Sequence, residues 1–151
     1  MEPALIGIIS DTHGLLRTAA VTALSGCELI LHAGDVGGPE ILAGLRRIAP
    51  VVAVRGNMDD GPWADALGEG ETVVVAGLRL HVRHIRVERD AEEADVVITG
   101  HSHLPVVERS GGVLYVNPGS AGPRRFRLPV SVAVLEIADG KARARIVEIA
   151  G

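Results

Sequence analysis

The 151-residue chain has little of several residue types that define common protein classes. Its single cysteine, Cys27, excludes an internal disulfide framework and any multi-cysteine zinc module, and fits a reducing compartment. Its single lysine, Lys141, follows an Asp-Gly turn, so no glycine-rich loop can offer a phosphate-binding lysine. Aromatic residues make up 2% of the chain, which leaves no stacking platform of the kind that binds single-stranded nucleic acid.

Long hydrophobic runs and a strong net charge are also missing. The longest apolar runs fall far short of the roughly 20 residues that span a bilayer, and no basic segment of a signal peptide precedes the first of them. The net charge of -4 gives no overall electrostatic footprint for nucleic acid or for an acidic membrane surface. We therefore expect a soluble cytoplasmic protein with no membrane contact, and do not expect nucleic acid as a partner.

Aliphatic residues are what the chain has in quantity. Apolar residues make up 47% of it, mostly Val, Ile, Leu and Ala, and β-branched aliphatic side chains suit buried strands. The length is that of a common single domain with a real core, so one domain over residues 1–151 is expected.

The first half of the chain predicts alternating strands and helices. Such an alternation implies right-handed crossovers and a parallel sheet, whose strand ends meet at one edge. The expected elements are a strand at Leu5–Ile9, a helix after Gly14 through Ser25, a strand at Glu28–Ala33, a helix from Pro39 to Ile48, and a strand at Val51–Arg55.

The second half predicts strands joined by hairpin turns, after a loop from Gly61 to Gly70. The expected strands are Glu71–Ala76, Leu78–His84, Val96–Thr99, Val106–Arg109, Val113–Val116, Val130–Ile137 and Lys141–Ile149. The prediction is an α/β protein with a βαβαβ first half and a mostly antiparallel second half.

Metal-capable side chains follow five of the predicted strands. They are Asp11 and His13, Asp35, Asn57, His84, and His101 with His103. A carboxylate can bridge two metal ions, imidazoles supply nitrogen, and the Asn side chain supplies a neutral oxygen. Seven such groups suit two ions that share one carboxylate.

Each candidate also has an ordinary structural interpretation. Asp11 could form a turn or cap a helix, and Asp35 could cap the helix that begins at Pro39. Asn57 could be a turn residue, and His101 with His103 could lie on a solvent-exposed turn. Their joint position at predicted strand ends favours the metal-site interpretation.

In these motifs the sequence resembles the calcineurin-like metallophosphoesterases, in their small single-domain phosphodiesterase branch. The matching segments, in the family's order, are Asp11-Thr12-His13, Gly34-Asp35, Gly56-Asn57, His84 and Gly100-His101-Ser102-His103, followed by Asn117-Pro118-Gly119-Ser120. The resemblance implies a two-sheet β-sandwich flanked by helices, with a dinuclear site at its edge. It also implies hydrolysis of a phosphate ester by in-line attack of a hydroxide that bridges the two ions.

The resemblance assigns a role to each matching residue. Asp11, His13 and His103 would hold one divalent ion, and Asn57, His84 and His101 the other, with Asp35 between them. Manganese is the expected metal, with iron, nickel, cobalt and zinc as alternatives. The catalytic residues would be Asp35, Asn57 and His101.

Substrate contacts are expected from Asn57 and Arg124, which would bind a small phosphate ester. Arg124, Arg125 and Arg127 are equally well interpreted as a solvated basic face. The Asn117–Ser120 block is interpreted as a structural turn.

Two departures from the family pattern concern the substrate side. Met58 occupies the position after the Gly-Asn pair where many phosphomonoesterases carry a histidine, so water, Asp59 or His32 would have to protonate the leaving group. The usual His-Gly-His is His84-Ile85-Arg86 here, and the short segment before Asp95 leaves one substrate-side wall open. His81 competes with His84 as a ligand, but strand parity favours His84.

A binding scaffold is the alternative function, because a eukaryotic retromer subunit has a similar fold. His13 argues against it, since the scaffold carries another residue there. An open edge strand would support a homodimer.

Overall fold

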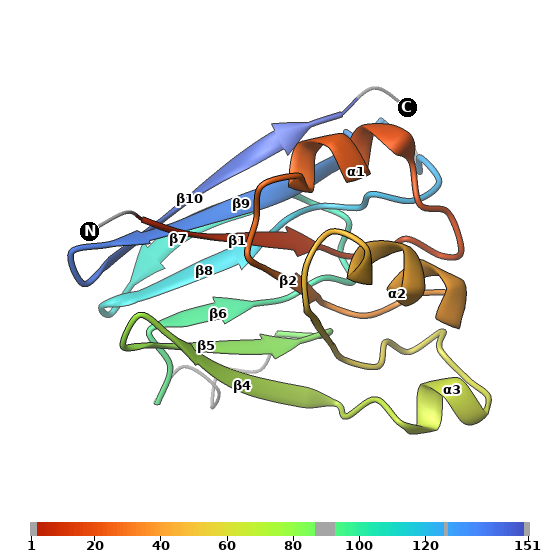
Figure 1. Ribbon diagram of the computed structural model, residues 1–151, viewed down its shortest axis with the longest axis horizontal. Helices are drawn as coiled ribbons and strands as arrows, with labels where there is room; N and C mark the ends of the chain where they lie inside the picture. Colours follow the sequence, from red (N-terminus) through yellow and green to blue (C-terminus); the bar gives the residue numbers. More distant parts are fainter. Residues whose placement is uncertain (1–2, 87–92, 126, 150–151) are drawn as a thin grey trace.

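Two five-stranded sheets pack face to face in a computed structural model that describes residues 3–86, 93–125 and 127–149. Helices α1 (Thr18–Leu24) and α2 (Pro39–Arg46) pack on the outer face of one sheet (Figure 1). This arrangement confirms the two-sheet sandwich with helices outside. No helix in the described part of the chain has the length and apolar character that a bilayer crossing requires.

The first sheet has the strand order β10-β9-β1-β2-β3. Its parallel part consists of β1 (Ala4–Ile9), β2 (Leu29–His32) and β3 (Val51–Ala53), as the βαβαβ pattern predicts. The returning strands β9 (Ser131–Ala138) and β10 (Lys141–Glu148) are antiparallel.

The second sheet has the strand order β4-β5-β6-β8-β7 and is mixed. Its strands are β4 (Gly70–Val75), β5 (Leu78–Arg83), β6 (Val96–Ile98), β7 (Val106–Ser110) and β8 (Val113–Asn117). The two outer pairs are antiparallel hairpins, but β5 pairs with β6, and β6 with β8, in parallel. A short helix, α3 (Pro62–Asp65), lies within the predicted loop and begins at a proline, which suits the first helical position.

Strand alternation divides the core into two layers. Side chains such as Ile6 and Ile8 of β1 face the second sheet, while Ile9 contributes to the cluster beneath the helices. Each of these three side chains is fully buried, and burying one is worth roughly 1.5–3 kcal/mol. The two layers fix the sheets relative to each other and to the helices.

The arrows of β1, β5 and β6 all point to the same end of the molecule (Figure 1). The loops that leave these strands, together with those after β2 and β3, carry every predicted ligand. The sandwich therefore gathers side chains from both sheets at one edge.

Candidate metal centre

Six of the seven predicted ligands form two groups at this edge. Within each group the nitrogen or carboxylate oxygen atoms lie within 4.8 Å of one another. Asp11, His13 and His103 form the first group, and Asp35, His84 and His101 form the second. Three potential ligand atoms that close together can share one metal ion.

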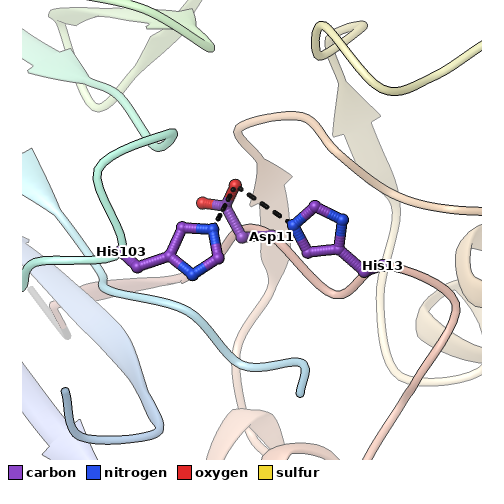
Figure 2. Close-up of side chains that lie close together, drawn as sticks. All are labelled: Asp11, His13 and His103. Carbon is purple, nitrogen blue, oxygen red and sulfur yellow. Dashed lines mark ion pairs between the residues drawn. The ribbon is translucent and has the colours of Figure 1, made fainter. Parts of the chain in front are cut away.

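Asp11 is the centre of the first group, with the two imidazoles on either side of its carboxylate (Figure 2). Its Oδ1 lies 3.8 Å from His13 Nε2 and 3.4 Å from His103 Nε2. Its Oδ2 accepts hydrogen bonds from Ser10 Oγ at 2.8 Å and from the His101 amide at 3.1 Å. Within the described residues Asp11 Oδ1 accepts no hydrogen bond, although Asp11 is fully buried. This buried oxygen therefore faces the two histidines without a hydrogen-bond donor.

His84 is the centre of the second group. Its Nδ1 must carry a proton, because it donates at 2.7 Å to the carbonyl of Ala33. This leaves Nε2 directed at two oxygen atoms, Asn57 Oδ1 at 2.9 Å and Asp35 Oδ2 at 3.2 Å. Asn57 therefore lies beside the second group, where the sequence predicts a ligand.

Asp35 lies between the two groups. Its Oδ2 is 3.7 Å from His13 Nε2 in the first group and 3.2 Å from His84 Nε2 in the second. Its Oδ1 accepts the Met58 amide at 2.9 Å, which holds the carboxylate in this orientation. Asp35 Oδ2 therefore lies within 3.7 Å of a histidine from each of the two groups.

The backbone is left-handed at most of these positions. Among the described residues seven other than glycine have a positive φ, and five of them are Asp11, His13, Asp35, His101 and His103, with φ between 46° and 68°. The other two, Ala76 and Asp139, precede glycines in hairpin turns. Such a conformation costs about 1–3 kcal/mol per residue and clusters at functional sites.

Burial and hydrogen bonding shift the pKa values of the group in opposite directions. Burial raises the pKa of Asp11 above its ordinary value despite the hydrogen bond from Ser10. Burial also acts to raise the pKa of Asp35, but hydrogen bonds from His84 and the Met58 amide lower it to about 2. Burial acts to lower the pKa of His84, yet the bonds to Asp35 and to the Ala33 carbonyl raise it overall. The site thus places two buried carboxylates among imidazoles, and burial and hydrogen bonding have opposing effects on their pKa values.

Several supporting residues hold the ligand loops. Asn117 Nδ2 donates to the Gly100 carbonyl at 2.9 Å and to Ser102 Oγ at 3.1 Å, while Ser120 Oγ donates to the Asp11 carbonyl at 3.0 Å. The Asn117–Ser120 block is therefore a structural turn, as predicted. Sequence reasoning missed Ser10, which had no motif to distinguish it from any serine at a strand end.

Two of the predicted proton donors are engaged in hydrogen bonds within the protein. Both carboxylate oxygens of Asp59 are used by backbone amides, those of Val36, Gly37 and Gly56, at 2.9–3.1 Å. His32 is fully buried between Thr12 Oγ1 and the Gly34 amide, and burial lowers its pKa to about 4. Both side chains are therefore held by hydrogen bonds within the protein, and His32 has no exposed surface.

His81 and Arg124, which the sequence also singles out, lie outside the two candidate ligand groups. His81 bonds with Thr72 Oγ1 at 2.8 Å and belongs to neither candidate ligand group, whereas His84 belongs to the second. Arg124 is exposed to solvent. Burial lowers the pKa of His103, and the positive charge of Arg125, the neighbour of Arg124, acts in the same direction.

Two cavities flank the second ligand group and share Ile85 as a wall. One, of about 350 Å³, is lined by Arg55, Asn57, Arg83 and His84 among others. The other, of about 300 Å³, opens beside His101 and includes Arg86 and Tyr115. The metal centre is thus accessible from both sides of Ile85.

Residues 5–140 match the calcineurin-like phosphoesterase superfamily domain. The chain belongs to this family. Over 96% of its length it is 37% identical to a probable metallophosphoesterase of Methanocaldococcus jannaschii, of which it covers 81%. It is 29% identical to phosphodiesterase YfcE of Escherichia coli, with 84% of each protein covered. This calcineurin-like phosphoesterase is therefore an enzyme of the metallophosphoesterase class.

Solved structures agree with the family assignment at the level of the fold. Vacuolar protein sorting 29 from Cryptosporidium parvum superposes with a TM-score of 0.80 over 100% of both chains, at 20% sequence identity. That likeness shows a shared fold. The family itself implies divalent metal ions, for which the two ligand groups of this phosphoesterase are the candidates.

Proposed function

We propose that the protein is a dinuclear, metal-dependent phosphodiesterase that acts on small phosphate esters. The observation that carries this proposal is the position of Asp35 Oδ2, within 3.7 Å of a histidine from each ligand group. Asp11, His13 and His103 would hold one ion, and Asn57, His84 and His101 the other. Asp35 would bridge them.

The residues present fit two divalent ions. The fully buried Asp11 Oδ1 has no hydrogen-bond donor among the described residues, and a cation would supply the missing positive charge. The Ala33 carbonyl fixes the tautomer of His84 that leaves Nε2 as a ligand, as an outer partner of a metal-bound histidine does. The mixed oxygen and nitrogen donors suit manganese, and also iron, cobalt, nickel and zinc.

Two ions bound here would lower the pKa of a water molecule and hold phosphate oxygens for in-line attack. The side chains provide the orientation for this chemistry. The amide of Met58 holds Asp35 in place, and Asn57 lies next to His84 where a phosphate oxygen would approach. Because the side chains of Asp59 and His32 are held in hydrogen bonds within the protein, we expect the leaving group to take its proton from water or to need none, which favours activated diesters.

The test is hydrolysis of an activated aryl phosphodiester in the presence of Mn²⁺. Asp35→Asn and His101→Ala should abolish turnover, because each removes a ligand. Asp139→Asn is a matched control, since Asp139 has nearly the same left-handed φ, 53° against 54°, but lies in the β9–β10 hairpin. Full activity in either ligand variant would overturn the proposed mechanism.

A non-catalytic scaffold remains the alternative, and the fold shared with vacuolar protein sorting 29 is what favours it. His13 argues against it, since this imidazole lies within 3.8 Å of both carboxylates. Metal analysis separates the two functions. Purified protein that cannot be loaded with metal but co-purifies with a partner would support the scaffold.

A further inference from the structure

The cavity beside His101 is lined by an aromatic side chain, although the chain has few aromatic residues. Tyr115, the only tyrosine, lines it on β8. The guanidinium carbon of Arg86 lies 4.0 Å from the centroid of the Tyr115 ring, which is the distance of a stacked cation–π pair. Arg86 and Tyr115 thus form a stacked platform at the entrance to the metal centre.

The charge of Arg86 is already partnered. Its Nη1 lies 3.6 Å from Glu108 Oε1, on the strand next to Tyr115. This ion pair holds the guanidinium from one edge, so its flat face rather than its charge is available to a ligand. The side chains of Arg86 and Glu108 are each about half exposed, so this contact is open to solvent.

The rest of the cavity is suited to an apolar group of ring size. Ile85 and Val106 form further walls, and Ile85 is 47% exposed although it directly follows the ligand His84. Gly100, His101 and Ser102 close the side toward the metal centre. The volume of about 300 Å³ is sufficient for an aromatic ring and its linking atoms.

We propose that this cavity binds one ester arm of the substrate, and that the arm carries a planar aromatic ring that stacks on Arg86 and Tyr115. The inference rests on the proposed function, because the phosphate must sit at the ligand groups for its arm to enter here. The substrate class is accordingly a phosphate diester with an aryl or heteroaromatic arm.

Binding of two phosphonates to the Mn²⁺-loaded protein tests this proposal. Phenylphosphonate and cyclohexylphosphonate have the same anionic head and apolar arms of similar size, but only the first arm is flat. Calorimetric titration should show about fivefold tighter binding of phenylphosphonate, the size of one ring-stacking contact. Arg86→Met and Tyr115→Leu should each reduce this preference to below twofold, whereas Arg46→Met, an exposed arginine on α2, should retain it.

A second measurement reports on the site without relying on turnover. Since Tyr115 is the only tyrosine, its ring proton signals are unambiguous in NMR spectra. With diamagnetic Zn²⁺ in place of the paramagnetic Mn²⁺, phenylphosphonate should shift them by its ring current in the wild type and in Arg46→Met. Cyclohexylphosphonate should leave them nearly unchanged.

The possible outcomes distinguish a failure of the aromatic subsite from a failure of the proposed function. Equal binding of the two phosphonates, or a preference that persists in Arg86→Met, overturns the aromatic subsite while the phosphodiesterase activity stands. If neither phosphonate binds and no diester is hydrolysed, the proposed function fails and this inference fails with it.

Discussion

Seven of the described residues other than glycine adopt a left-handed backbone, and five of these seven are predicted metal ligands. The left-handed backbone at these positions is strained, and it sets the direction of the side chains. A strand end in the ordinary extended conformation would direct them elsewhere. His101 is the most useful of the five for measurement, because its side chain is exposed and little packing is lost when it is removed.

His101→Gly and His101→Ala should differ in stability. Both remove the imidazole, but only glycine adopts a φ of 68° without strain, so the glycine variant should be more stable by about 1 kcal/mol. For a chain of this size that corresponds to about 2–4 °C in Tm, measured on metal-free protein by calorimetry. Equal Tm values would show that the backbone at this position is unstrained.

His32 should make the protein sensitive to acid. Its pKa is about 4 in the folded chain, against 6.5 for an ordinary histidine, because burial disfavours the charged form. As the pH falls between these values, the unfolded chain takes up a proton that the folded chain does not, so stability is lost. The loss from this one group should be about 2 kcal/mol between pH 7 and pH 5.

Chemical denaturation of the wild type and of His32→Gln at both pH values measures that contribution. Other titrating groups are common to the two proteins and cancel in the comparison. The wild type should lose more stability on acidification than the variant. Parallel losses would mean that the imidazole is charged in the folded state.

At the scale of elements, the loops after β2 and β3 are joined by one carboxylate. Asp59 accepts the amides of Val36 and Gly37 from the first loop and of Gly56 from the second. Gly56 itself lies so close to the carboxylate and backbone nitrogen of Asp35 that a Cβ there would collide with both. The relative placement of Asp35 and Asn57 therefore depends on this junction.

Asp59→Ala should destabilise the protein by about 3 kcal/mol, because it leaves buried amide donors without acceptors. It should also weaken Mn²⁺ binding, although Asp59 is not a predicted ligand. Asp60→Ala is the control, since Asp60 is exposed and adjacent in sequence. Urea denaturation and Mn²⁺ titration of both variants measure these two effects. Equal stability and equal Mn²⁺ affinity in the two variants would show that Asp59 does not hold the two loops together.

At the scale of the whole molecule, the candidate metal ligands come from both sheets. Asp11, Asp35 and Asn57 follow strands of the first sheet, while His84, His101 and His103 follow strands of the second. Ions held by both sets would bind only the folded protein, and a ligand of that kind stabilises by mass action. Chelation should therefore lower the stability of the entire sandwich.

A free Mn²⁺ concentration 100 times the Kd should add about 2.7 kcal/mol of stability relative to chelated protein. Thermal unfolding with Mn²⁺ and with EDTA measures this difference. Asp35→Asn should greatly reduce it, and Asp139→Asn should leave it intact. A Tm that does not respond to Mn²⁺ in the wild type would contradict the metal site.

The sequence alone determined the order of elements and the edge at which chemistry gathers. Apolar periodicity and turn residues are local, so the parallel βαβαβ half and the ligand-bearing strand ends at Asp11, Asp35 and Asn57 followed from nearest neighbours in the chain. Strand parity was sufficient to favour His84 over His81 for the same reason. These local patterns were sufficient to predict the fold class and to suggest the family.

Only the tertiary structure decided how the two halves meet. The parallel pairing of β5, β6 and β8, the closeness of Asp35 to histidines of both ligand groups, and the stacking of Arg86 on Tyr115 join residues far apart in the chain. Burial of His32 and the three amide bonds to Asp59 likewise depend on what packs around these side chains, so neither could be predicted from the sequence. Local pattern specifies what each strand end carries, and packing specifies which atoms it meets.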